Sequence, residues 1–211
     1  YEWYPFRKYK MRKENTIPRT IPIEEMKSYF NLVLPPSHLC YRSWLIGKLI
    51  FMLRGINIKD LLLLSLNNIK NGRIIYKRAK TGKIYSVNLS DEVKDILQQF
   101  ESNKTLLGIL KDQDFRNKEK LVKIIAQKRK VINNHLKKIG KTLETEEPIT
   151  TYVFRYSYAN IAKRLGYSKD LIGEALGHNV GSIITGIYLE QFDMEVVDEM
   201  NDTIIRKVWG G

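Results

Sequence analysis

Three residues that could act together on a phosphodiester lie near the C-terminal end of the chain: Arg155, His178 and Tyr188. A tyrosine hydroxyl can attack phosphorus, but its pKa of about 10 makes it a weak nucleophile unless its target is activated. Arginine suits that task, because its planar guanidinium binds two phosphate oxygens and stays charged. His178 could donate a hydrogen bond to the same phosphate or help to deprotonate Tyr188. The set therefore indicates phosphodiester chemistry with Tyr188 as the nucleophile.

Lys80 is a fourth candidate, because of its place between two predicted strands. The segments RIIYKRAK and KIYSVNLS alternate as strands do and flank Thr81-Gly82, so Lys80 is expected at the tip of a hairpin. From there it could reach a minor groove and protonate the departing oxygen. Because no Asp, Glu or His residues have metal-ligand spacing, the sequence predicts chemistry without a metal.

Composition favours a polyanionic partner. The 211 residues include 36 Lys+Arg and 23 Asp+Glu, for a formal charge of +13, and 43% are hydrophobic. A chain with this much apolar content can bury a core, so the charge belongs to a folded protein. Nucleic acid is the first expected partner, and an anionic membrane surface or an unspecific basic surface is the alternative. Cys40 is the single cysteine, which excludes an internal disulfide, and no apolar run approaches the roughly 20 residues of a membrane span.

The elements that must position these residues are mostly helices. Asn71-Gly72 is a hairpin signal before the two strands, so we expect a small antiparallel sheet in a mainly α (α+β) fold. Helices are predicted from Ile23, twice between His38 and Ile69 (the second over about Ile56–Ser65), after Ser90, from Lys118 to Leu143, from Thr151 to about Leu165, from Ser168 to Gly177, and from about Asp193 to Val208.

Four short motifs in this order resemble those of one enzyme family. They are KTG at 80–82, YVFR at 152–155, LGH at 176–178 and TGIY at 185–188. The chain resembles the catalytic domain of tyrosine recombinases, the phage-integrase family, over about Asn15 to Asp202. It is most similar to integrases of mobile elements in Bacteroides-like bacteria.

The resemblance implies a complete activity. Tyr188 would form a 3′-phosphotyrosyl intermediate and release a 5′-hydroxyl, and strands would exchange at double-stranded attachment sites without a cofactor. It also implies a bacterial, cytoplasmic protein that self-associates to a tetramer on DNA. Residues 1–19 would be the linker from an N-terminal core-binding domain, and residues 20–211 the catalytic domain, which alone would bind DNA weakly as a monomer. In the family, the segment after the nucleophile packs on a neighbouring protomer or folds back on its own.

The sequence departs from the family pattern at several positions. Tyr152 replaces the histidine of H-x-x-R; its hydroxyl could bind a phosphate oxygen, or its ring could only pack. The family's first arginine aligns with Asn57, so we hypothesise that Arg54 substitutes for it, one turn away if the stretch is helical. The alternative is that Arg54 forms a local salt bridge. His178 and Tyr188 are ten residues apart, where nine is commoner.

Basic residues are concentrated from Lys118 to Lys141, interleaved with apolar ones. This pattern predicts a helix pair whose cationic face contacts DNA phosphates without reading sequence, or else a merely solvated surface.

Other functions fit parts of the sequence. A type IB topoisomerase would use the same chemistry to relax supercoils. A DNA-binding module with a decayed recombinase site would explain Asn57, Tyr152 and Tyr156. A basic RNA-binding domain is the third alternative, but the aromatic stacking motifs of such domains are missing.

Overall fold

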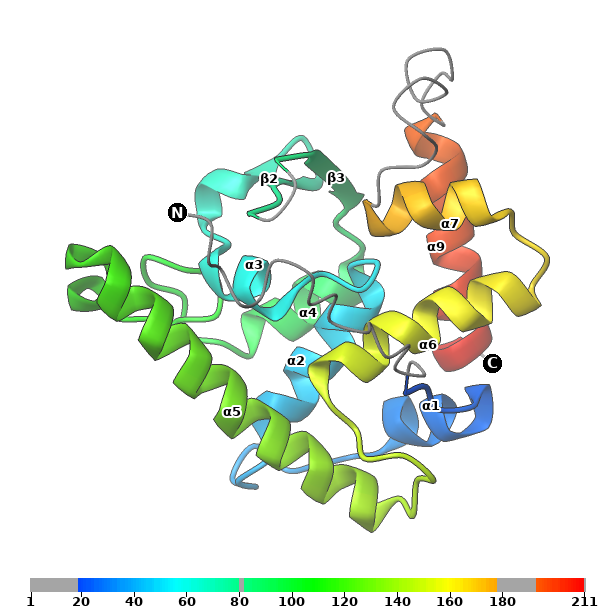
Figure 1. The fold of residues 1–211 in the computed structure, drawn as a ribbon, viewed down its shortest axis with the longest axis horizontal. Helices are drawn as coiled ribbons and strands as arrows, with labels where there is room; N and C mark the ends of the chain where they lie inside the picture. Colours follow the sequence, from blue (N-terminus) through cyan, green and yellow to red (C-terminus); the bar gives the residue numbers. More distant parts are fainter. Residues whose placement is uncertain (1–18, 80–81, 178–192, 211) are drawn as a thin grey trace, which may run out of the picture.

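A computed structural model describes residues 19–79, 82–177 and 193–210, and every structural statement below refers to these residues. As predicted, the fold is mainly helical with one small antiparallel sheet (Figure 1). The elements in order are α1 (Ile23–Asn31), α2 (Tyr41–Met52), α3 (Ile58–Leu63), β1 (Ile69–Lys70), β2 (Arg73–Lys77), β3 (Ile84–Asn88), α4 (Asp91–Gln98), α5 (Lys118–Thr142), α6 (Thr151–Arg164), α7 (Lys169–Leu176) and α9 (Met194–Trp209), with short 3₁₀ turns at Leu66–Asn68 and Asp112–Arg116.

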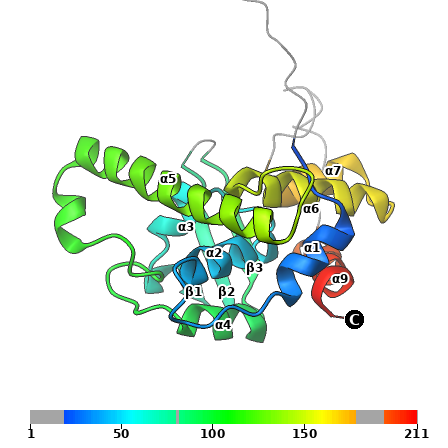
Figure 2. The same cartoon turned by 90° about the horizontal axis from the view of Figure 1, so that it is seen from below.

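Helix α2 lies at the centre of the core. All its residues from Ser43 to Met52 are buried, which a helix with apolar residues on every side requires. It packs against α4, α5 and α6. Figure 2 shows α5, α6 and α7 along one side of the molecule and α4 on the opposite side, with α2 between them. The turn that follows α2 is therefore held deep inside the protein.

The three strands are antiparallel in the order β1-β2-β3. Asn71 and Gly72 join β1 to β2 with φ of 49° and 70°, the left-handed pair of a two-residue hairpin. Strands β2 and β3 pair from Arg73 with Asn88 to Lys77 with Ile84. Both the Asn-Gly turn and the second hairpin were predicted from the sequence, and both are confirmed.

Several helix ends also follow their sequence signals. The Ser90 hydroxyl accepts a hydrogen bond from the Val93 N–H at the start of α4, and the Ser168 hydroxyl accepts one from Leu171 at the start of α7. Gly177 ends α7 with φ of 62°, a value that glycine adopts readily.

The helix pair predicted for the basic stretch is wrong: α5 is one helix of 25 residues. No proline interrupts it, and Gly140 lies only in its last turn. Its buried residues Ile125, Ile132, Leu136 and Ile139 form one continuous stripe, so a single helix can cover the core without a break.

The C-terminal helix α9 folds back onto its own chain, which is one of the two alternatives left open by the sequence. It packs on α1, α6, α7 and β3 and buries an apolar stripe of Val197, Met200, Ile204 and Val208. None of the helices in the described part of the chain is long and apolar enough to cross a membrane.

A buried lysine links α9 to the core. The Lys48 ammonium of α2 lies 4.1 Å from the ring centroid of Trp44, 4.4 Å from that of Trp209 on α9 and 5.6 Å from that of Phe30 on α1. Such contacts favour the charged amine. Burial works in the opposite direction and lowers the pKa of the Lys48 amine from 10.5 to about 8.

This buried amine makes the free energy of unfolding depend on pH. Between the folded pKa of about 8 and the ordinary value of 10.5, the unfolded chain binds more protons, so stability rises with pH in that window. Lys48→Met should remove this rise, which we expect to be on the order of 1 kcal/mol because the rings oppose the shift. Denaturant unfolding at several pH values measures it. Lys128→Met, on the exposed side of α5, is the control and should keep the rise; a rise that persists in Lys48→Met would contradict the assignment.

Candidate functional site

The structure describes three of the six candidate residues. Arg155 lies in α6, Tyr152 lies one turn before it, and Arg54 follows α2. Lys80, His178 and Tyr188 lie outside the described residues, so their predicted roles stay predictions.

Arg155 is buried, and its guanidinium joins two separate segments. Nη1 donates to the carbonyl of Gly55, in the turn after α2, at 2.6 Å. Nη2 donates to the carbonyl of Leu176, the last residue of α7, also at 2.6 Å. Burial, and then the charge of Arg78, lower the pKa of Arg155 from its ordinary value, yet an arginine stays protonated at physiological pH. The protein thus holds a fixed positive charge where α6, the end of α7 and the turn meet.

Two glycines allow this close meeting. Gly55 has φ of 65°, and a Cβ on it would lie 2.8 Å from Cγ and 3.0 Å from Cα of Arg155. Gly177 has φ of 62°, and a Cβ there would overlap the Tyr85 hydroxyl. Any larger residue at either position would push apart the segments that surround Arg155.

The hairpin that carries the predicted Lys80 is tied to α7 on both of its arms. On one arm, Arg78 Nη1 donates to the carbonyl of Gly177 at 2.9 Å. On the other, Lys83 Nζ lies 2.6 Å from Glu174 Oε2 in an ion pair. These contacts bring the segments next to residues 80 and 178 to the same place, beside Arg155. Arg78, Lys83 and Glu174 were not predicted as part of the site, because a basic residue beside a strand or an acidic residue on a helix carries no local signal.

Asp60 of α3 also holds the hairpin. Its Oδ1 accepts a hydrogen bond from the Ala79 N–H at 3.2 Å. Burial raises the pKa of Asp60, and the hydrogen bond from Ala79 and the charges of Arg78, Lys59 and Arg155 oppose that rise. This contact of Asp60 with the backbone before residue 80 joins positions 19 residues apart and could not be read from the sequence.

Tyr152 lies on the exposed face of α6. Its exposed fraction is 48%, and its ring centroid lies 5.8 Å from that of Tyr156, one turn later. A residue this exposed contributes little to the core, and it shares an exposed face of α6 with Tyr156.

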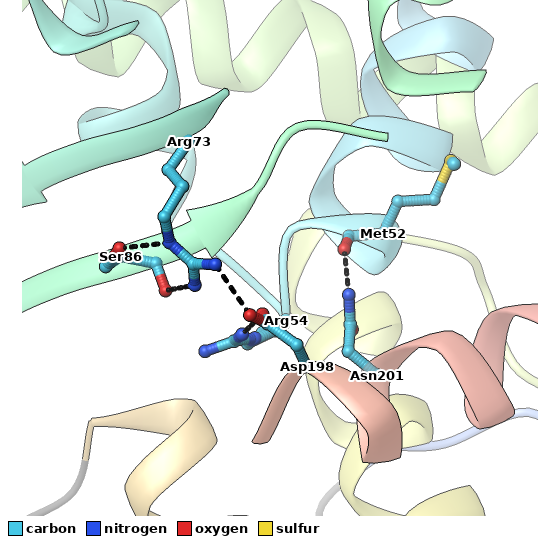
Figure 3. Close-up of polar contacts among 6 residues, drawn as sticks. All are labelled: Met52, Arg54, Arg73, Ser86, Asp198 and Asn201. Atoms are coloured by element: carbon cyan, nitrogen blue, oxygen red, sulfur yellow. Dashed lines mark hydrogen bonds and ion pairs between the residues drawn. The ribbon is translucent and has the colours of Figure 1, made fainter. Parts of the chain in front are cut away.

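The premise that Arg54 and Asn57 share a helical face is wrong. Arg54 and Gly55 have φ of 55° and 65°, left-handed values that break a helix. Asn57 is the N-cap of α3, where its Oδ1 accepts a hydrogen bond from the Lys59 N–H at 2.9 Å. Arg54 is buried and pairs with the Asp198 carboxylate of α9 (Figure 3). It does form a salt bridge, as the alternative proposed, but with a residue distant in sequence.

The close contact between Gly55 and Arg155 leads to a testable prediction about position 55. In Gly55→Ala the new methyl group would clash with Arg155 in addition to the backbone strain at positive φ. We expect a loss of about 1–3 kcal/mol in the free energy of unfolding beyond that of Gly72→Ala. Gly72 is the matched control, because its φ is 70° but a Cβ on it meets no described atom within 4 Å. Equal losses in denaturant unfolding would show that contact with Arg155 is not what requires a glycine at position 55.

Comparisons with known proteins address the family and the fold of the chain. The sequence matches the model of the "Phage integrase family" over residues 40–195. Among solved structures, an integrase from mycobacterium phage Brujita is 11% identical with a TM-score of 0.59, and the match covers 93% of this chain and 60% of that one. The site-specific recombinase XerH, bound to its difH substrate in a pre-cleavage complex, is 19% identical with a TM-score of 0.51, and the match covers 90% of this chain and 56% of that one.

At these identities the two structures show a shared fold, and this chain spans less than two thirds of the length of either protein. No curated protein sequence matches the chain. Because the family model matches most of the chain, and because the mainly helical fold with its small sheet is that of the two neighbours, the protein belongs to the phage integrase family.

Proposed function

We propose that this protein is a site-specific DNA recombinase that cleaves and rejoins DNA through a tyrosine nucleophile. The observation that carries this proposal is the buried guanidinium of Arg155, held by the carbonyls of Gly55 and Leu176 at 2.6 Å each. Transfer of a phosphodiester to a phenol builds negative charge on the non-bridging oxygens, and a preorganised cation is the group that stabilises it.

The proposed steps assign one task to each candidate. Tyr188 Oη attacks phosphorus and loses its proton, with His178 as the acceptor or as a hydrogen-bond donor to the phosphate. The bond from phosphorus to the 5′ oxygen breaks, and Lys80 supplies the proton that makes the 5′-hydroxyl. Arg155 neutralises the phosphate throughout. Because the 3′-phosphotyrosyl bond retains the energy of the broken phosphodiester, attack by another 5′-hydroxyl reverses the step without a cofactor.

Double-stranded DNA is the proposed partner, at attachment sites joined by a tetramer of such proteins. The XerH neighbour is a recombinase in complex with its difH substrate. Support in this chain comes from α5, which carries nine lysines and arginines and one acid, Glu119. Lys123, Lys130 and Lys137 recur every seven residues and are exposed, each two residues before a member of the buried stripe. Helix α5 lies on the side of the molecule that also holds α6 and α7 (Figure 2).

A DNA-binding module with an inactive centre is the second candidate. It is favoured by the places of two residues: Asn57 caps α3, and Arg54 pairs with Asp198. In that reading no second arginine replaces the one missing from the family pattern. A relaxing enzyme of the type IB class is distinguished by assay, because it would relax a supercoiled plasmid but would not exchange strands between two attachment sites.

Covalent trapping tests the proposal directly. A DNA duplex with a nick close to the cleavage point loses the short strand that carries the 5′-hydroxyl, so the protein stays attached. We expect a denaturant-resistant adduct with the unchanged protein and none with Tyr188→Phe, which lacks the nucleophile. Tyr41→Phe, a change at an exposed hydroxyl bonded to Gln99, is the control and should form the adduct. No adduct with any variant would favour the inactive module. An adduct with Tyr188→Phe would show that Tyr188 is not the nucleophile.

Salt dependence tests the role of α5. If Lys130 and Lys137 contact phosphates, the double variant Lys130→Ala/Lys137→Ala should bind DNA more weakly, and its slope of log K against log salt should fall by about 2, near 0.9 for each lost contact. Titrations by fluorescence anisotropy at several salt concentrations measure the slope. Lys94→Ala, on α4 at the opposite side of the molecule, should leave it unchanged. An unchanged slope in the double variant would make α5 a solvated surface only.

A further inference from the structure

The C-terminal helix reaches the turn that holds Arg155. This turn runs from Leu53 to Gly55, directly after Met52, the last residue of α2. Asn201 of α9 donates from Nδ2 to the carbonyl of Met52 at 3.0 Å in a buried hydrogen bond. One helical turn earlier on α9, Asp198 binds the guanidinium of Arg54 (Figure 3). Two neighbouring side chains of α9 therefore bind the chain on either side of Leu53: Asn201 at Met52 and Asp198 at Arg54.

Asp198 is itself fixed from the sheet. Its second oxygen lies 2.7 Å from Arg73 Nη1. Arg73 in turn donates to Ser86 of β3, from Nε to the hydroxyl at 2.6 Å and from Nη2 to the carbonyl at 3.0 Å. The side chains of Arg54, Asp198 and Arg73 are exposed by only 6%, 15% and 23%. An ion pair shielded to this degree is screened little by salt, and removing one partner leaves the others uncompensated.

The backbone conformation of Arg54 requires support from contacts such as the ion pair with Asp198. Its φ of 55° is a left-handed value that residues other than glycine rarely adopt, and such a conformation persists only where the surroundings hold it. The next residue in the chain is Gly55, whose carbonyl accepts the hydrogen bond from Arg155 Nη1 at 2.6 Å. A change of φ at Arg54 would rotate the chain that follows and move this carbonyl.

We propose that Asp198 is a positioning residue for the reaction: through Arg54 it fixes the turn at Gly55 and thereby the guanidinium of Arg155. This inference rests on the proposed recombinase function. Arg73 and Asn201 hold the same turn from the sheet and from α9. Arg54 then supports the turn whose carbonyl holds Arg155. Its own charge is neutralised by Asp198 and does not act on the phosphate.

If Asp198 inhibits the reaction, the expected effect of removing its carboxylate is reversed. If Arg54 were a phosphate ligand that Asp198 blocks, removing the carboxylate would release Arg54 and speed up cleavage. If Asp198 positions Arg155, removing the carboxylate lets the turn relax and slows cleavage.

The experiment measures the rate of adduct formation on two nicked DNA duplexes. One has an ordinary phosphodiester at the cleavage point, and the other has a methylphosphonate, in which a methyl group replaces one non-bridging oxygen. The methylphosphonate has no negative charge, so its reaction depends less on a well-placed cation. We expect Asp198→Asn to slow cleavage of the phosphodiester on the order of 10- to 100-fold, as a displaced catalytic group does, and to slow cleavage of the methylphosphonate much less.

Glu199→Gln is the matched control, because it removes one carboxylate from an exposed position next to Asp198 on α9; both its rates should equal those of the unchanged protein. Arg73→Gln is a milder variant of the same cluster and should give the same pattern with a smaller loss. Arg54→Met combined with Asp198→Asn should lose no more than the worse single variant, because both act on one turn. Thermal unfolding confirms that each variant is folded at the assay temperature.

The outcomes separate the two levels of the proposal. If the unchanged protein forms no adduct on the phosphodiester, the proposed function fails. If it does, three results overturn the positioning role of Asp198: an unchanged rate in Asp198→Asn, a faster rate, or an equal loss on both substrates while the variant is folded. Loss confined mainly to the phosphodiester, in both Asp198→Asn and Arg73→Gln, supports it.

Discussion

A buried guanidinium whose position is set by two backbone carbonyls is the constraint on which the rest of the site depends. Arg155 lies in α6, but its acceptors come from Gly55, 100 residues earlier, and Leu176, 21 residues later. A charge removed from water must be compensated by oriented dipoles, so the two segments that provide them cannot move independently of α6. Glycines at positions 55 and 177 let those segments approach closely, and the contacts of Arg78, Lys83 and Asp60 add the hairpin to the same assembly.

Positive charge is used in two ways in this protein. The lysines of α5 lie on the outside, where the amines are hydrated and can attract a polyanion over a distance. The arginines near the centre have named partners: buried Arg155 is held by carbonyls, and buried Arg54 and half-buried Arg73 are held by Asp198. Hydrated charges favour association, whereas fixed charges favour a particular geometry. This division fits the proposed recombinase, which would first hold a long duplex and then act at one phosphate.

Local signals predicted the elements of the fold but not the contacts between them. The Asn71-Gly72 turn, the caps at Ser90 and Ser168 and the left-handed end of α7 at Gly177 each depend on a few adjacent residues, so the sequence was sufficient for them. Two helices were also predicted where α2 and α3 lie, but the left-handed backbone between them was not, because Arg54 adopts a positive φ that its residue type disfavours. The pair of Arg54 with Asp198 spans 144 residues, and no periodicity links positions so far apart. In the site, Arg155 could be selected by its motif, but its partners Gly55 and Leu176 could not.

The turn after α2 also depends on the order in which the chain is synthesised. A ribosome releases the N-terminal part first, and that part can begin to fold while the rest is being synthesised. Helix α2 and the strands can then form early, but the contacts from Asp198 and Asn201 lie 144 and 149 residues downstream of Arg54 and Met52. The contacts that support the turn beside Arg155 are therefore completed only when α9 has emerged, so a nascent chain carries the exposed lysines of α5 before it carries the partners of Arg54 and Met52.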